Sequence, residues 1–382
     1  MSNRIKIGIV TRRDATDKRE WSGTLYSMTQ TLEKHVGDVY SLGPYNPKGL
    51  NFLLKAIRKI SKWVFNKNYM ILYNWFLAKR YKKFFEKKIS EQKPDIIVAI
   101  SSAVEMSMLN VDIPIIYVGD TTLKLLRNYY EPFSNLSKFS ILESELIERL
   151  CFKNSKSLVF SSTWAYDSAI SDYKVDEKKI HLIPYGANFV NLPKTEDIIN
   201  KPVDDVCNLF FIGVDWVRKG GELAYQTFIE LKKMGLKVHF TVIGTLIPND
   251  YPKDDTTEIK FLDKNDPEQA KTLYDIFMNT NFLIVPTRAD CTPIVFNEAN
   301  AFGIPVISTN TGGIASVITN NVNGYIFELS DSPKLYAQKI HELYSDTEKY
   351  KKLVLSSRKE YDTRLNWDNW GRNMKTIVED LL

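Results

Sequence analysis

The chain alternates short, uniformly apolar runs with longer segments in which apolar residues recur at helical spacing. The apolar runs are rich in Val, Ile, Leu and Phe and show no polar alternation, as is typical of parallel strands covered on both faces. Strands separated by helices predict right-handed crossovers and doubly wound sheets, which bind ligands beyond the carboxyl ends of their strands. The predicted strands are Ile5–Thr11, Asp95–Ile100, Ile113–Val118, Ser157–Phe160, Ile180–Ile183, Asn208–Val214, Lys237–Ile243, Ile259–Leu262, Asn281–Val285 and Pro305–Ser308.

This pattern occurs twice within the 382 residues, and a polar, proline-containing stretch from Val190 to Pro202 separates the two passes. A typical domain size of about 100–200 residues also favours two domains. We therefore predict an α/β chain with one domain at 1–188 and a second at 189–360. A C-terminal helix at 361–382 follows, with the N-terminal domain as its candidate packing partner. A cleft between two such domains is a natural small-molecule site.

Composition excludes several classes of protein. Hydrophobic residues make up 44% and charged residues 25%, the balance of a globular chain, and a net charge of +5 is too small to predict a nucleic-acid partner. Three scattered cysteines (Cys151, Cys207 and Cys291) and four unclustered histidines argue against a disulfide framework or a zinc site. Neither a signal peptide nor a long uncharged apolar run is visible, so we expect a cytoplasmic protein.

One segment, residues 51–93, departs from this average. It contains 12 Lys or Arg residues against two Glu, interleaved with aromatic residues such as Trp63 and Phe76. Helical spacing of its apolar positions predicts one or two amphipathic helices. Two interpretations stay open: a solvated helical face that covers the first sheet, or a peripheral contact with an anionic membrane and a lipid-linked acceptor.

The most informative stretch is residues 285–305. A buried strand ends at Val285, a loop carries Asp290, and Thr292 is placed to cap a helix whose first position is Pro293. Gly303 then ends that helix before the next strand begins. The stretch therefore reads as strand, loop, capped helix and strand.

This helix start predicts an anion site. The backbone amides of Ile294 and Val295 point out of a positive helix end, which binds a diphosphate without a metal ion. Asp290 stands at the mouth of that site, and Glu298 follows about one and a half turns into the helix. Both carboxylates suit the hydroxyl groups of a sugar and a ribose. We expect the base to lie near residues 262–266 and Thr287.

Residues 285–305 resemble the E-x7-E region of glycosyltransferase family 4, retaining enzymes of the GT-B fold, with Asp290 in place of the first Glu. Residues 211–221 resemble the family's G-R-x-x-x-x-K-G phosphate loop, which implies that Lys219 reaches the donor diphosphate. Val214 replaces the family's Arg, so Arg218 is the candidate second cation. Further segments are similar to the family: Ile7–Thr11, Trp21–Thr24, Ile183–Asn188, Thr309–Ile314 and Asn323–Phe327.

The resemblance implies two Rossmann-like domains facing a central cleft, an N-terminal one for the acceptor and a C-terminal one for the nucleotide-sugar donor. It implies transfer of a hexose or N-acetylhexosamine from a UDP- or GDP-type donor to a glycan or lipid-linked acceptor, as in bacterial surface polysaccharide synthesis. No further cofactor and no metal are expected. Asp290 would orient the sugar, Glu298 the ribose, and Gly23 would lie in a loop that reaches the donor. Asp120 is the candidate for a strand-end position that often holds a catalytic His.

Several alternatives stay open. The chain is also compatible with an inactive nucleotide-sugar binding subunit, with a GT-B sugar-nucleotide epimerase, and with a phosphorylase. A location at the inner face of the membrane follows only if residues 51–93 bind lipid. The sequence does not distinguish the donor bases or the acceptors.

Overall fold

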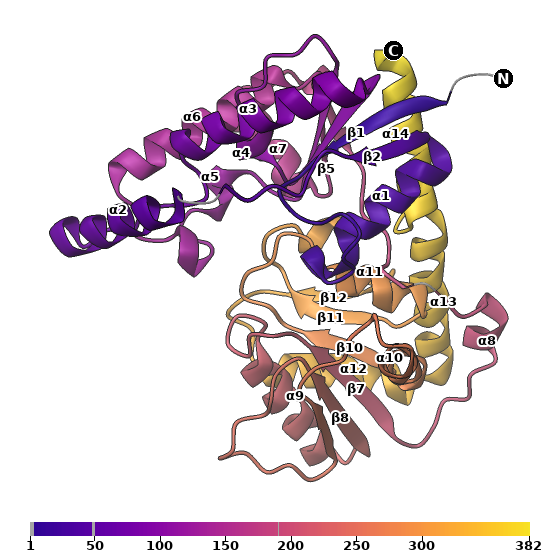
Figure 1. The fold of residues 1–382 in the computed structure, drawn as a ribbon. Helices are drawn as coiled ribbons and strands as arrows, with labels where there is room; N and C mark the ends of the chain where they lie inside the picture. The colour runs from indigo at the N-terminus through magenta and orange to yellow at the C-terminus, as the bar shows by residue number, and fades with distance from the viewer. Residues whose placement is uncertain (1–3, 48–49, 190) are drawn as a thin grey trace. The chain divides into compact units, whose positions relative to one another are not determined.

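The computed structural model describes residues 4–47, 50–189 and 191–382 (Figure 1). Its chain forms two compact units. Unit 1 comprises the residues up to Pro184 together with Trp367–Leu382, and unit 2 comprises Tyr185–Asn366.

Unit 1 is built on a parallel sheet of six described strands in the order β2-β1-β3-β4-β5-β6. The strands are β1 (Ile5–Val10), β2 (Gly37–Ser41), β3 (Ile96–Ile100), β4 (Ile115–Gly119), β5 (Ser157–Phe160) and β6 (Ile180–Leu182). Every residue of β3 and β4 is buried, because helices cover both faces of the sheet.

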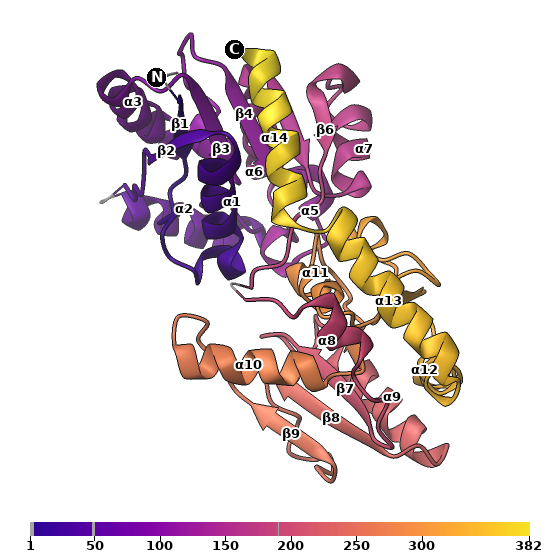
Figure 2. The same ribbon diagram turned by 90° about the vertical axis from the view of Figure 1, so that its right-hand side faces the viewer.

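The helices of unit 1 divide between the two faces of this sheet. Ile97 and Tyr117 pack with Phe85 and Ile147 from the helices of one face. The helices α1 and α14 run side by side, as Figure 2 shows. The α-helices are α1 (Thr24–His35), α2 (Leu50–Phe65), α3 (Trp75–Gln92), α4 (Ala103–Met106), α5 (Leu123–Leu126), α6 (Lys138–Asn154), α7 (Thr163–Ser171) and α14 (Trp367–Leu381), and short 3₁₀ turns lie at Glu20–Gly23, Glu131–Phe133 and Glu177–Lys179.

The last helix, α14, is fixed against α1. Asp368 accepts hydrogen bonds from Lys34 at 2.6 Å and lies 2.7 Å from the His35 ring. Gly371 allows the close approach, since a Cβ there would lie 2.6 Å from both Thr31 and His35 side-chain atoms. Trp370 is fully buried. The C-terminal helix therefore belongs to the same unit as the first strand.

A buried carboxylate, Glu148 of α6, holds the start of α5. Both of its oxygens accept the Leu123 amide at 2.9 Å. Burial raises the pKa of Glu148 from its ordinary 4.5 to about 7, and hydrogen bonds from Tyr173 and Leu123 only partly oppose that rise. The folded unit therefore holds a proton on this side chain at a pH where the unfolded chain has already lost it.

This proton makes stability depend on pH. Between the two pKa values, about 4.5 and about 7, the folded protein binds more protons than the unfolded chain, so stability falls as the pH rises through that window. Glu148→Gln removes the titration. We expect the parent protein to lose on the order of 2–3 kcal/mol of unfolding free energy relative to this variant across the window. Urea unfolding at several pH values measures this, with the exposed Glu131→Gln as control; parallel curves for parent and Glu148→Gln would contradict it.

Unit 2 repeats the architecture, with a parallel sheet of six described strands in the order β12-β11-β10-β7-β8-β9. The strands are β7 (Cys207–Ile212), β8 (Val238–Ile243), β9 (Thr256–Ile259), β10 (Phe282–Val285), β11 (Val306–Thr309) and β12 (Gly324–Phe327). The chain proceeds outward from β7 through β8 to β9, then returns to place β10 on the other side of β7. The sheet thus has a topological switch point between β7 and β10.

Six α-helices of the described chain surround this second sheet. They are α8 (Thr195–Ile199), α9 (Gly221–Lys233), α10 (Pro267–Asn279), α11 (Ile294–Ala301), α12 (Pro333–Ser345) and α13 (Thr347–Thr363), and a 3₁₀ turn lies at Ile314–Ser316. One continuous core of aromatic and aliphatic side chains, including Phe210, Phe277 and Phe296, joins the helices to the strands.

The predicted fold class, two doubly wound parallel sheets, is confirmed. Nine of the ten predicted strands lie within two residues of their observed ends. The tenth is misplaced: we predicted Ile259–Leu262, whereas β9 ends at Ile259 and Phe261 is exposed. Two strands, β2 and β12, were not predicted. Both lie at sheet edges, β2 is polar, and β12 is only four residues long.

The boundaries between the units differ from those predicted at 188/189 and 360/361. The first lies after Pro184, because the Tyr185 carbonyl already accepts a hydrogen bond from Asn297 of α11. The second lies after Asn366, because Arg364 donates to the Ser316 and Val317 carbonyls and thereby keeps the end of α13 in unit 2. Val190, where the predicted linker begins, lies outside the described residues, and the rest of that stretch includes α8.

Candidate functional site

The switch point of the second sheet brings together the two most informative sequence motifs. The loop at 213–220 follows β7 and the loop at 286–293 follows β10, and these two strands pair in parallel. Their carboxyl ends therefore open at the same edge, with the following helices leaving in different directions. Open α/β sheets bind their ligands at this position.

Glycines shape the first of these loops. Gly220 has a φ of 75°, and a Cβ there would lie 1.9 Å from the Pro286 carbonyl oxygen, so the loop after β7 docks directly on the loop after β10. A Cβ on Gly213 would lie 2.7 Å from the Lys219 side chain, and one on Gly221 would overlap the Trp216 ring at 2.3 Å. The three glycines thus leave space for the Pro286 carbonyl, the Lys219 side chain and the Trp216 ring, and so allow the close packing around Lys219.

Further hydrogen bonds hold the two loops together. The Arg218 carbonyl accepts from the Arg288 amide at 2.7 Å and from the Thr287 hydroxyl at 3.0 Å. Thr287 is fully buried and also bonds the Ala289 carbonyl. Its hydroxyl therefore joins the loops in this structure, and a contact with the base stays a prediction.

Lys219 and Asp290, which the sequence assigns to the diphosphate and the sugar, are in contact. The Lys219 Nζ donates to Asp290 Oδ2, and both side chains are mostly buried. The Arg218 Nη1 lies 3.9 Å from the same carboxylate oxygen and donates to the Ala289 carbonyl at 3.0 Å. Two cations and one carboxylate therefore share one small, partly covered space.

The position that holds Arg in the family motif does not contribute a charge here. Val214 is 79% exposed at the surface of the loop. Arg218, four residues later, has its backbone amide bonded to Asp215 at 3.0 Å and its guanidinium directed to the Ala289–Asp290 backbone and side chain. The structure thus places a second positive charge beside Lys219, but from a different position of the loop.

The helix after Asp290 begins one residue later than predicted. Pro293 is the N-cap residue and α11 starts at Ile294, whereas capping by the Thr292 side chain stays a prediction. The fixed φ of proline suits this entry into the helix. The amides of Ile294 and Val295 lie in the first turn, where a helix leaves its donors unused. Gly303, with a φ of 68°, follows the end of the helix as predicted.

Glu298 is buried in α11 and has a partner that the sequence did not reveal. Its Oε1 accepts from Lys264 Nζ at 2.6 Å, and its side chain is only 3% exposed. Lys264 lies in the loop between β9 and α10, within the segment predicted to lie near the base, and its Nζ also sits 5.0 Å from the centre of the Phe189 ring. The 34-residue separation explains why no sequence pattern indicated this pair.

In unit 1 the predicted residues lie at the carboxyl edge of the first sheet. Gly23 is buried with a φ of 89° and precedes α1, after Trp21 and Ser22 in the same left-handed region. Asp120 directly follows β4 and is half-buried. The sequence missed a pair at this edge: Arg12, after β1, lies 3.6 Å from the buried Glu105, after β3. Desolvation raises the pKa of Glu105 despite Arg12.

Across residues 4–47, 50–189 and 191–382, no group of three or more His, Cys, Asp or Glu side chains stands close enough to hold a metal ion. The three cysteines are buried and form no disulfide bonds within the described residues, and one of them, Cys291, lies beside Asp290 in the sequence.

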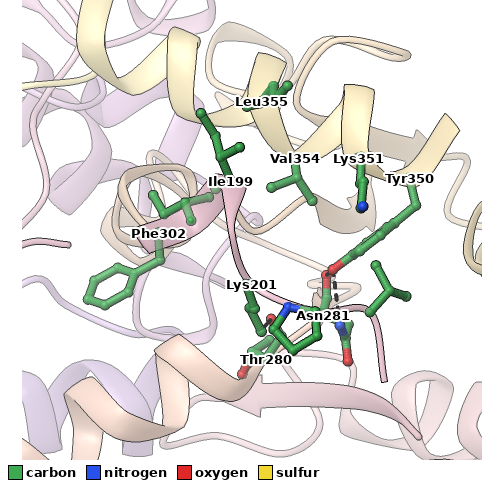
Figure 3. Close-up of a pocket in the computed structure, with 13 residues that line it drawn as sticks. Ile199, Lys201, Thr280, Asn281, Phe302, Tyr350, Lys351, Val354 and Leu355 are labelled. Atoms are coloured by element: carbon green, nitrogen blue, oxygen red, sulfur yellow. Dashed lines mark hydrogen bonds between the residues drawn. The ribbon is translucent and has the colours of Figure 1, made fainter. Parts of the chain in front are cut away.

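A separate cavity of about 70 Å³ lies at the opposite end of the second sheet (Figure 3). It is next to Asn281, which precedes β10, whereas Asp290 follows that strand. Lys201 donates to the Thr280 carbonyl at 3.0 Å, and burial lowers the pKa of Lys201 to about 8. Asn281 donates to the Tyr350 hydroxyl at 3.1 Å, the dashed contact in Figure 3. The cavity is therefore distinct from the predicted site.

The two six-stranded parallel sheets, each with its switch point, define the GT-B fold of glycosyltransferases. Sucrose-phosphate synthase from Thermosynechococcus elongatus superimposes with a TM-score of 0.67 at 16% identity, over 99% of each chain. Anabaena HepE, solved in complex with UDP and glucose, superimposes with a TM-score of 0.62 at 13% identity, over 98% of this chain and 100% of HepE.

Residues 194–360, which include the phosphate loop and α11, match the family model described as glycosyl transferases group 1. Spore coat protein SA of Bacillus subtilis is 29% identical over 183 residues, which are 48% of this chain and 42% of the relative. The capsular polysaccharide biosynthesis glycosyltransferase CapM of Staphylococcus aureus is 23% identical over 251 residues, 62% of this chain and 65% of CapM. The chain thus spans about half the length of the curated relatives it matches.

Proposed function

We propose that this chain is a metal-independent, retaining glycosyltransferase of family 4. It transfers a hexose or N-acetylhexosamine from a UDP- or GDP-type donor to a glycan or glycolipid acceptor. The observation that carries the proposal is the contact of Lys219 and Asp290 at the switch point, inside the segment that matches group 1 glycosyl transferases.

The charges at this edge suit a nucleotide diphosphate. Lys219 and Arg218 offer two cations, and the first turn of α11 adds the positive end of a helix. Together they supply the charge that a metal ion would otherwise bring to the leaving diphosphate. Stabilising a leaving group with fixed charges and dipoles is the largest single contribution in many enzymes.

The transfer itself needs little covalent chemistry from the protein. The acceptor oxygen forms a bond to the anomeric carbon of the sugar on the face from which the diphosphate departs. The bond between that carbon and the phosphate oxygen breaks, and the departing phosphate oxygen takes the proton of the acceptor hydroxyl. Asp290 orients the donor sugar by accepting its hydroxyl hydrogens. Glu298, held by Lys264, does the same for the ribose. Their work is positioning.

Unit 1 supplies the acceptor side in this proposal. Gly23 lies in the tight turn before α1, which we assign to the donor-reaching loop, and Asp120, directly after β4, is the residue that we assign to the reacting carbon. The similarity to CapM supports a surface polysaccharide or its lipid-linked precursor as acceptor. A location at the inner face of the membrane follows from that acceptor, and it too is a proposal.

A thermal-shift panel of uridine, guanosine, adenosine and thymidine diphosphates with their common sugars, in the presence of EDTA, tests the donor site. A ligand that binds only the folded state raises the melting temperature with its concentration. We expect one base to give a clear shift that EDTA does not reduce. If none of the nucleotides raises the melting temperature, the assignment of Lys219 and Glu298 to the donor site is contradicted.

The same ligands separate the alternatives. A transferase releases free nucleoside diphosphate at an appreciable rate only when an acceptor is added, whereas an epimerase converts the donor without one. An inactive binding subunit shows the thermal shift but no release with any acceptor. The dependence of nucleotide release on acceptor therefore decides between the proposed function and its rivals.

A further inference from the structure

The described part of unit 1 exposes an unusual number of large apolar side chains on two of its helices. On α2, Trp63 is 86% exposed and Phe52 is 84% exposed. Soluble proteins normally leave such side chains exposed only singly, and a cluster of them marks an interaction surface. The cluster, which we call the α2–α6 face, comprises Phe52, Ile60, Trp63, Val64 and Phe65 of α2 and Phe139, Leu142 and Leu146 of α6.

The geometry of α2 directs its two most exposed aromatic side chains away from unit 1. Leu54 and Ser61 are buried and lie seven residues apart, so they mark the inward side of the helix. At 3.6 residues per turn, Phe52 and Trp63 fall on the opposite side. Figure 1 shows α2 as an elongated helix at the edge of the unit. The most exposed aromatic residues therefore form the outermost line of this helix.

Basic residues flank that line on one side. Lys55, Arg58, Lys59 and Lys62 are all exposed. Within the described residues, none of these four forms an ion pair with a carboxylate, whereas Lys82, Lys87 and Lys88 of α3 pair with Glu86 or Glu91. The helix thus combines an apolar outer line with a row of uncompensated positive charge.

A second apolar line on α6 adjoins the end of α2. Phe139, Leu142 and Leu146 recur at a spacing of three and four residues and are all exposed. The loop after α2 is bonded to the start of α6, since the Asn68 amide donates to the Asn135 carbonyl at 2.8 Å and Tyr69 stacks on Phe139 with ring centroids 6.3 Å apart. The two lines therefore belong to one continuous part of the surface.

We propose that the α2–α6 face docks on an anionic phospholipid surface. Trp63, Phe52 and the α6 line insert at the boundary of the acyl chains, and the four basic residues bind the headgroups. Amphipathic helices with an apolar face and Lys or Arg beside it bind membranes in this way. Within the described residues no helix is long and apolar enough to cross a bilayer, so the contact is peripheral. The membrane contact would bring the enzyme to a lipid-linked acceptor, and in this one respect the inference rests on the proposed function.

Co-sedimentation of the full chain with vesicles tests the proposal. We expect binding to vesicles of equal parts phosphatidylcholine and phosphatidylglycerol, weaker binding at high salt, and little binding to phosphatidylcholine alone. Lys59→Ala/Lys62→Ala should lower the partition coefficient by about tenfold or more. Phe52→Ala/Trp63→Ala should lower it by a comparable factor, and Phe139→Ala/Leu142→Ala tests the α6 line in the same way.

Matched controls exclude a general loss of charge or apolar surface. Lys351→Ala/Lys352→Ala and Leu329→Ala/Leu335→Ala change exposed residues of unit 2 and should leave vesicle binding unchanged. Equal binding by all variants, or no binding of the parent chain to anionic vesicles at low salt, would overturn the proposal. Self-association of the parent chain that Phe52→Ala/Trp63→Ala abolishes would overturn it too, since a second copy would then cover the face.

The vesicle-binding result can be distinguished from the test of the transferase function. The nucleotide thermal shift of the α2–α6 variants should equal that of the parent chain, because the substitutions lie in unit 1 and the predicted diphosphate site lies in unit 2. Vesicle binding without any nucleotide shift would remove the proposed function and leave the membrane surface standing. A nucleotide shift without vesicle binding would do the reverse.

Discussion

Lys219→Ala is expected to lower kcat/KM by about 10²–10³-fold, because in the proposed function it removes a charge that stabilises the leaving diphosphate. Lys219 is also the side chain for which Gly213 makes room, and a cation held in place before the substrate arrives is worth more than a mobile one. The affinity for nucleoside diphosphate should fall as well, by roughly 10-fold or more. Steady-state kinetics with calorimetric titration of the nucleotide measures both effects. Lys233→Ala, an exposed lysine at the end of α9, is the matched control.

Lys219→Ala is expected to affect stability as well as activity, and a second substitution addresses the loss of stability. Without Lys219, the buried Asp290 carboxylate loses the cation that donates a hydrogen bond to it, and Arg218 lies 3.9 Å away, so the variant should also lose stability. The double variant Lys219→Ala/Asp290→Asn removes that charge and should recover stability without recovering activity. Recovery of activity along with stability would remove both Lys219 and Asp290 from the catalytic site.

Asp290→Asn is expected to reduce kcat by at least about 10²-fold while the chain still binds nucleoside diphosphate. In the proposed function the carboxylate accepts hydroxyl hydrogens of the sugar with both oxygens, and an amide offers a single acceptor oxygen in its place. The release of Lys219 from its contact with Asp290 should leave nucleotide affinity equal or higher. Turnover and nucleotide affinity, measured on the same preparations, check this.

The exposed Asp250→Asn serves as the control for this substitution. Near-normal turnover of Asp290→Asn would remove Asp290 from the site. A parallel loss of turnover and nucleotide affinity would instead assign it to holding the phosphate loop.

The sequence predicted the parts of the fold that local patterns control. Uniformly apolar runs such as Ile96–Ile100 predict buried parallel strands, because only strands covered on both faces lack polar positions. Edge strands lack this signal. Gly37–Ser41 is half polar, and β9 carries three polar residues in four, so tertiary pairing and not side-chain pattern determines them.

In the candidate site, too, local sequence patterns predicted some residues, whereas others are brought in only by the tertiary structure. Asp290 and Glu298 could be predicted because each lies at a fixed offset from a helix start, and Lys219 because its loop resembles a motif of the family. The partners Lys264 and Arg12 could not be predicted, since each meets its carboxylate across a chain separation that only the folded sheet closes.

The inclusion of α14 in unit 1 has a consequence for biosynthesis. Trp367–Leu381 leaves the ribosome only after all of unit 2, yet it packs on α1, which is made near the start. Domains usually fold in the order of their synthesis. Here unit 2, which is contiguous in sequence, can complete its core first, while α1 still lacks α14, whose Gly371 packs against Thr31 and His35. Until α14 is made, the side of α1 that packs against it stays uncovered.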